Sequence, residues 1–120
     1  MAYDSDNIFA KILRGEIPCD RVAENDQALA FNDISPQAPV HILVIPKGAY
    51  VSSDDFYSTA EPAEISGFHA LVAQVARDAG LVESGYRLIA NHGADGGQEV
   101  FHFHMHVMGG QPMGPMVVRR

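Results

Sequence analysis

The spacing of apolar residues predicts a short helix near the N-terminus and one long helix in the middle of the chain. At the first helix, Ser5 and Asp6 are suited to cap the start, and Gly15 is placed to end it. The second helix, over residues 58–80, shows apolar residues at helical spacing along one face. Those positions are Ile65, Phe68, Val72, Val75, Ala76 and Ala79. Each predicted helix therefore has one face for packing.

Shorter apolar runs, bounded by turn-forming residues, predict strands. Residues 21–32 are typical of a hairpin, and further strands are expected at residues 40–45, 86–90 and 100–108. Two prolines within residues 33–39 predict a stiff loop, and residues 91–98 form a polar, glycine-rich loop. Hairpin-like pairs with only one long helix favour an antiparallel α+β domain over a parallel sheet.

Composition narrows the class of protein. The 120 residues suit a single domain over residues 1–120, and a hydrophobic fraction of 47% predicts a packed core. Eight Lys and Arg against fifteen Asp and Glu give a net charge of -7, which argues against long nucleic acids but allows a small phosphorylated ligand. Cys19 is the only cysteine, and no apolar stretch is long enough to span a bilayer. We therefore expect a cytoplasmic protein with no membrane partner.

Three histidines, His102, His104 and His106, occupy alternate positions of the last predicted strand. Alternate side chains share one face of a strand, where neighbouring Cα atoms lie roughly 6.6 Å apart. A single histidine on a half-exposed strand is usually only a tolerated polar residue, but three in strict alternation indicate a functional site.

Two kinds of chemistry fit this face. Histidines one residue apart on a strand commonly bind zinc or copper, and His41 could supply a further ligand. The glycine-rich loop before the strand instead offers main-chain N–H groups suited to phosphate. Spacing alone leaves metal and phosphate chemistry nearly balanced.

The segment His102-Phe103-His104-Met105-His106-Val107-Met108 resembles the motif of the histidine triad (HIT) superfamily. Residues 8–18, 33–47 and 96–100, and Gly109-Gly110 after the motif, are similar to the Hint branch, so the resemblance covers nearly the whole chain. It implies a HIT-like fold: a five-stranded antiparallel sheet with one long central helix and a short N-terminal helix. It also implies a homodimer with a continuous sheet.

The activity implied by this resemblance is hydrolysis of purine nucleoside phosphoramidates, with adenosine 5'-monophosphoramidate as the model substrate and no metal or other cofactor. His104 resembles the nucleophile, which forms a nucleotidyl-imidazole intermediate that water then hydrolyses. Its other ring nitrogen would donate to the main-chain carbonyl of His102. His106 resembles the residue that contacts the phosphate and helps the amine leave, while His41 and His102 resemble a supporting pair.

The resemblance also assigns residues that contact a purine nucleotide. Asp33 matches the position that holds the ribose hydroxyls, Asn91 matches a ligand-contacting asparagine, and Gln98 lies near the phosphate in that pattern. Glu99 stands where many animal members carry a serine that reaches the leaving group, so a serine-dependent step is in doubt. The base pocket is expected at five apolar positions, each of which would serve equally well as core: Phe9, Ile17, Phe31, Ile34 and Leu43.

Three alternatives remain beside the phosphoramidate hydrolase. A dinucleoside polyphosphate hydrolase of the same superfamily shares the triad and the glutamine before it, although residues 33–47 and Gly109-Gly110 fit Hint better. A nucleotide sensor or scaffold would use the same pocket by occupancy rather than turnover. A metal protein would carry stoichiometric zinc or copper.

Overall fold

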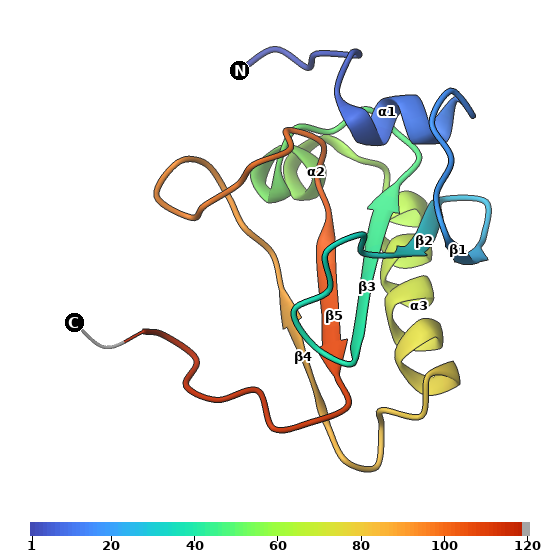
Figure 1. Ribbon diagram of the computed structural model, residues 1–120. Helices are drawn as coiled ribbons and strands as arrows, with labels where there is room; N and C mark the ends of the chain where they lie inside the picture. Colours follow the sequence, from blue (N-terminus) through green and yellow to red (C-terminus); the bar gives the residue numbers. More distant parts are fainter. Residues whose placement is uncertain (119–120) are drawn as a thin grey trace.

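The computed structural model describes residues 1–118, in which five strands form one antiparallel sheet and three helices pack against it (Figure 1). The order of strands across the sheet is β1-β2-β3-β5-β4. The strands are β1 (Arg21–Glu24), β2 (Ala28–Asn32), β3 (Val40–Pro46), β4 (Tyr86–Ile89) and β5 (Met105–Gly109). The helices are α1 (Ile8–Leu13), α2 (Ser53–Thr59) and α3 (Pro62–Asp78). The predicted α+β fold is confirmed.

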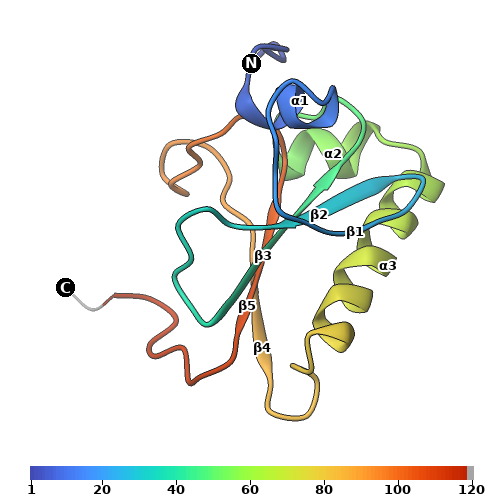
Figure 2. The same cartoon turned by 45° about the vertical axis from the view of Figure 1, so that its right-hand side comes forward.

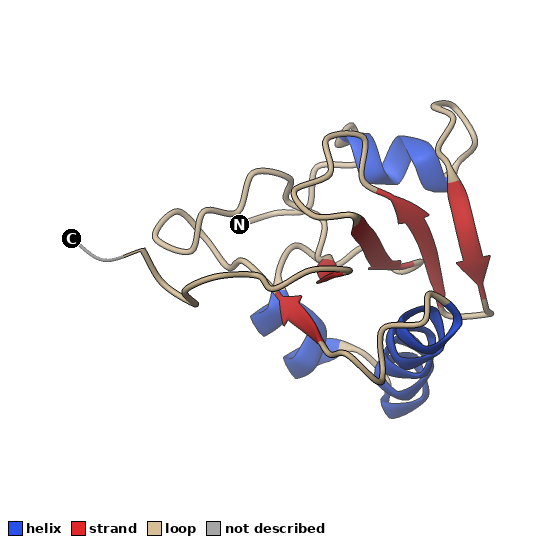
Figure 3. Ribbon diagram, turned by 60° about the horizontal axis from the view of Figure 1, so that its bottom comes forward, coloured by secondary structure: helices blue, strands red, loops and turns tan. Residues whose placement is uncertain are grey.

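The two faces of the sheet carry different helices. Side chains alternate along β2 and β3, so Ala28, Ala30, Ile42 and Val44 meet α3 on one face. The intervening residues face the other way and pack with Phe9 of α1. Figure 2 shows α3 running alongside the sheet, and Figure 3 shows α1 on the side opposite α2 and α3. The second cluster consists of Phe9, Leu29, Phe31, Leu43 and Ile45.

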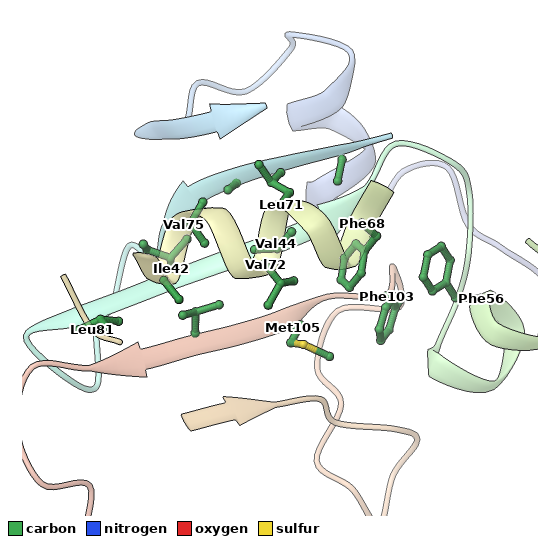
Figure 4. Close-up of a cluster of buried hydrophobic side chains, with 14 residues drawn as sticks. Ile42, Val44, Phe56, Phe68, Leu71, Val72, Val75, Leu81, Phe103 and Met105 are labelled. Carbon is green, nitrogen blue, oxygen red and sulfur yellow. The ribbon is translucent and has the colours of Figure 1, made fainter. Parts of the chain in front are cut away.

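An aromatic group anchors the larger core beside α3 (Figure 4). Phe56 of α2, Phe68 of α3 and Phe103 are at most 1% exposed, and the rings of Phe56 and Phe103 stack at 5.1 Å. Met105 and Val107 of β5 complete this face. The packing of Phe103 and of the apolar residues of β5 thus sets where the neighbouring histidines lie along the sheet and on which face their side chains lie.

The helices differ from their predicted bounds for local reasons. Asn7, rather than Ser5 or Asp6, caps α1 by accepting from the N–H of Ala10. A separate helix, α2, covers residues 53–59 behind the cap Ser52, although the pattern predicted no helix before residue 58. The long helix begins at Pro62 because Glu61 and Glu64 form a capping box there. None of the helices within residues 1–118 combines the length and apolar character that a membrane crossing requires.

The last strand is shorter than predicted, since it begins at Met105 rather than at residue 100. The main-chain N–H of Phe103 donates to the carbonyl of Tyr50, 2.7 Å away, instead of joining the sheet. Regular pairing with β3 starts at the Val44–Met105 pair. Of the three histidines expected on this strand, only His106 lies on it, and His102 and His104 belong to the irregular segment leading into it.

Candidate active site

Strands β3 and β5 bring His41 and His106 together on the face of the sheet that carries α1. Leu43 and His106 are register partners, and His41 lies two residues before Leu43 on the same strand, so all three share that face. The rings of His41 and His106 are 5.1 Å apart, and that of His104 lies 5.3 Å from His106. The topology therefore assembles three imidazoles from two chain segments.

The direction of the hydrogen bonds fixes the protons on His41 and His106. The main-chain N–H of Gln37 donates to Nδ1 of His41 over 3.0 Å, so in the neutral ring the proton is on Nε2. That Nε2–H donates in turn to Nδ1 of His106, 2.8 Å away. His106 then carries its own proton on Nε2, the nitrogen left to meet a ligand.

His104 has the opposite arrangement. Its Nδ1 lies 2.8 Å from the carbonyl oxygen of His102, which can only accept, so Nδ1 carries the proton. Nε2 of His104 therefore holds a lone pair, and the ring is steadied by the edge of Phe9 at a centroid distance of 5.0 Å. A lone pair on one nitrogen and a held proton on the other are the conditions for a neutral imidazole nucleophile.

Burial keeps these imidazoles neutral. It lowers the pKa of His102 and of His106 to about 4. The pKa of His104 is lowered as well, chiefly by burial, with its hydrogen bond to His102 acting in the other direction. Burial also lowers the pKa of His41, and the carboxylate of Asp33 opposes that shift. Near pH 7 the rings in this structure are therefore neutral. A neutral imidazole is suited to act as a nucleophile or a hydrogen-bond partner rather than as a cation that attracts an anion.

The same geometry bears on the metal alternative. Asp33, His41 and His106 offer ligand atoms that all lie within 4.8 Å of one another. However, a neutral ring that binds an ion through Nε2 must carry its proton on Nδ1, and the N–H of Gln37 already points at Nδ1 of His41. The donor set as arranged does not fit a metal ion.

A pocket of about 360 Å³ opens onto the histidines. His41, His104 and His106 line it together with Asp33, and Asn91 and Glu99 from the glycine-rich loop and its end complete the polar wall. A second hollow of about 640 Å³ adjoins it, because Phe9, Asp33, Leu43 and Glu99 line both. The cleft thus has a polar end and an apolar end.

The five predicted base-pocket positions all line the apolar end. They are Phe9, Ile17, Phe31, Ile34 and Leu43. Ile34 is 98% exposed there, so its side chain stands at the rim, whereas Phe31 and Leu43 also belong to the smaller core. Asp33 lies where the two ends meet, and the N–H of Ser35 donates to its Oδ1 at 2.7 Å. A carboxylate held between an apolar slot and the histidines is well placed for ribose hydroxyls.

Hydrogen bonds within the glycine-rich loop use several of its own main-chain N–H groups. The amide of Gln98 is buried, accepts from the N–H of Gly93 and donates to the carbonyl of Val51, so it holds the loop rather than lining either end of the cleft. The N–H groups of Gly97 and Gln98 donate to carbonyls within the loop. The N–H groups of Gly93, Gly97 and Gln98 are therefore used to shape the loop, and phosphate binding by this loop stays a prediction.

Two contributors were not predicted from the sequence. Gln37 acts through its main-chain N–H, which no side-chain pattern indicates. Tyr3 places its hydroxyl 2.6 Å from Nδ1 of His102, a residue 99 positions away. Only the two prolines near Gln37 gave a signal, by predicting a stiff loop there.

Comparisons with known proteins point to one family. The family model described as HIT domain matches residues 14–113. An uncharacterized HIT-like protein of Azospirillum brasilense is 58% identical over 117 residues, covering 98% of this chain and 96% of its own. The purine nucleoside phosphoramidase of Escherichia coli is 46% identical over 115 residues, covering 96% of each chain. The HIT family hydrolase from Clostridium thermocellum superposes with a TM-score of 0.87 at 37% identity, covering 96% of this chain and 99% of its own.

The chain belongs to the HIT family, and the resemblance seen in its sequence is confirmed. Two of these relatives, the E. coli phosphoramidase and the C. thermocellum hydrolase, carry names that state a hydrolytic activity, and the chain is accordingly a HIT-family hydrolase.

Proposed function

We propose that this protein hydrolyses the P–N bond of purine nucleoside phosphoramidates through a covalent nucleotidyl-histidine at His104. The observation that carries the proposal is the distance of 2.8 Å between Nδ1 of His104 and the carbonyl oxygen of His102, which assigns the ring proton to Nδ1. This hydrogen bond leaves the Nε2 lone pair on a ring that lines the pocket beside His106. The activity name of the E. coli relative supports the same chemistry.

The reaction divides into two displacements. A bound phosphate anion favours the protonated form of His106. Nε2 of His104 attacks the α-phosphorus, the P–N bond breaks, and the leaving nitrogen takes a proton from protonated His106, which becomes neutral. Water then attacks the phosphorus of the nucleotidyl-histidine, which frees His104, and neutral His106 accepts one proton of that water. The products are a nucleoside monophosphate and an amine. The purine occupies the apolar end of the cleft, and Asp33 accepts from the ribose hydroxyls.

The charge of the cleft favours a phosphoramidate over a dinucleoside polyphosphate. Within residues 1–118, no Lys or Arg lines either end, whereas Asp20, Asp33 and Glu99 do. A chain of several phosphates would bring its negative charges among carboxylates with no cation to balance them. A phosphoramidate brings one anionic phosphorus centre and releases an amine, whose positive charge the carboxylates favour.

The test is turnover of adenosine 5'-monophosphoramidate in the presence of a chelator, beside diadenosine polyphosphates at equal concentration. We expect the phosphoramidate to be the better substrate, and His104→Ala to abolish turnover while nucleotide binding persists. Rapid quench of the wild type is expected to trap nucleotide on His104. Undiminished activity in His104→Ala would contradict the mechanism, and tight binding without turnover by the wild type would favour a sensor or scaffold.

We further propose a homodimer that joins two sheets at β4. This strand is the last in the sheet order, so one of its edges has no partner strand within residues 1–118. Tyr86 and Leu88 on β4 are 39% and 45% exposed. An exposed edge with apolar side chains is a ready site for pairing with a second copy.

Leu88→Lys and Val22→Lys test this arrangement on opposite edges of the sheet. Val22 lies on β1, the other edge strand, and is 39% exposed. We expect Leu88→Lys to give monomers and Val22→Lys to stay dimeric when size-exclusion chromatography is followed by light scattering. Monomeric wild type would overturn the dimer, and dissociation by Val22→Lys alone would move the interface to β1.

A further inference from the structure

The N-terminal segment reaches the buried centre of the site through one side chain. The hydroxyl of Tyr3 lies 2.6 Å from Nδ1 of His102, and the two rings meet edge to face at 5.6 Å. His102 is fully buried, while Tyr3 is half-buried. Figure 1 shows the N-terminal segment at the end of the sheet where β5 begins.

The direction of this hydrogen bond follows from the second nitrogen of His102. Its Nε2 lies 2.8 Å from the carbonyl oxygen of Pro46, which can only accept, so Nε2 carries the proton. Nδ1 of the neutral ring therefore holds a lone pair, and the Tyr3 hydroxyl must donate to it. Both nitrogens of a ring without access to water are satisfied only in this tautomer and this orientation.

We propose that Tyr3 is a positioning residue of the active site, which locks the ring of His102 and thereby aims the main-chain carbonyl that orients His104. This role rests on the proposed reaction, in which His104 is the nucleophile. The carbonyl of His102 is the acceptor that keeps the proton on Nδ1 of His104. Because ring and carbonyl belong to one residue, a ring held at both nitrogens restricts the rotation of its own main chain.

Local hydrogen bonds hold Tyr3 in place. The next residue, Asp4, accepts through its carbonyl from the main-chain and side-chain N–H groups of Asn7, the cap of α1. The side chain of Asp4 also accepts from the N–H of Asp6. Tyr3 is thus attached to the start of α1, the helix whose Phe9 contacts His104. The N-terminal segment and α1 act on the histidines as one unit.

Tyr3→Phe tests the proposal, because it keeps the ring and its packing and removes only the donor. Tyr57→Phe is the matched control, since Tyr57 forms the same kind of bond to Nε2 of His69, at 2.9 Å, on the surface away from the cleft. The first readout is ¹⁵N NMR of the ring nitrogens of His102, which reports both the tautomer and the hydrogen bond that Nδ1 accepts. The second is kcat and KM for adenosine 5'-monophosphoramidate.

In wild type we expect His102 to carry its proton on Nε2 alone. In Tyr3→Phe we expect the carbonyl of Pro46 to keep the proton on Nε2 of His102, and the ¹⁵N resonance of Nδ1 to move downfield because its lone pair has lost the donor. We also expect a kcat about five- to tenfold lower, the size of effect given by loss of one buried hydrogen bond. KM is expected to change less than about twofold, because Tyr3 does not line the cleft. Tyr57→Phe is expected to match wild type in both readouts.

An Nδ1 proton on His102 in the wild type would overturn the proposal. So would an unmoved Nδ1 resonance in Tyr3→Phe, or a moved one with unchanged kcat. If the wild type hydrolyses no phosphoramidate, the proposed function fails, and the ¹⁵N measurement alone then decides whether Tyr3 holds the ring of His102.

Discussion

Acid is expected to destabilise the folded protein through His102. Burial lowers the pKa of this ring from 6.5 to about 4, so between these values the unfolded chain binds a proton that the folded protein does not. The stabilisation is therefore fully present above pH 6.5 and is lost as the pH falls toward 4. One proton gives a slope of about 1.4 kcal/mol per pH unit, and His102 alone removes about 2 kcal/mol between pH 7 and pH 5.

Urea unfolding followed by far-ultraviolet circular dichroism measures this loss, since the chain contains no tryptophan for fluorescence. The comparison is with His102→Gln, which keeps an amide for the carbonyl of Pro46 but does not titrate. The control is His92→Gln, whose parent ring is exposed on the glycine-rich loop.

The unfolding free energies of wild type and His102→Gln are expected to converge by about 2 kcal/mol from pH 7 to pH 5, because only the wild type loses this contribution. His92→Gln is expected to parallel wild type. Parallel curves for wild type and His102→Gln would refute the reasoning.

Three further outcomes are expected. Because burial lowers the pKa of His104, the acid limb of kcat/KM for a phosphoramidate lies below pH 6.5, and a limb at or above that value would contradict a buried nucleophile. Phe103→Ala, at a ring 1% exposed, is expected to lower the urea unfolding free energy by about 3 to 5 kcal/mol, and a loss under 1 kcal/mol would contradict its place in the core. In Gly96→Ala the new Cβ would lie 2.3 Å from the carbonyl oxygen of His92, so the loop must shift; we expect a several-fold loss of kcat/KM, and wild-type kinetics would show that the loop does not matter.

The spacing of apolar residues was enough to predict much of the fold from the sequence. It placed the hairpin of β1 and β2, the strand β3 and the long helix, because each buries one regular face. It failed where local hydrogen bonds replace regular pairing. Phe103 donates to Tyr50 rather than to the sheet, so β5 starts late although the histidines keep a strand-like spacing.

Those residues of the site that match a known sequence motif could be predicted. The motif located the histidines, and the family resemblance pointed to Asp33 and the apolar positions that line the cleft. The position of the proton on His41 and on His102 could not be predicted from the sequence, because main-chain groups decide it: the N–H of Gln37 for His41 and the carbonyl of Pro46 for His102. The role of Tyr3 could not be predicted, because its contact with His102 exists only in the folded chain and no local sequence pattern indicates it.

The absence of Lys and Arg from the cleft within residues 1–118 has a consequence for the speed of substrate capture. A protein with a net charge of -7 repels an approaching anion at long range, and no local basic patch reverses the sign. Added salt screens that repulsion over a distance of about 8 Å at physiological ionic strength. The association rate of an anionic nucleotide is therefore expected to rise with ionic strength, opposite to the behaviour of a basic cleft that draws its ligand in.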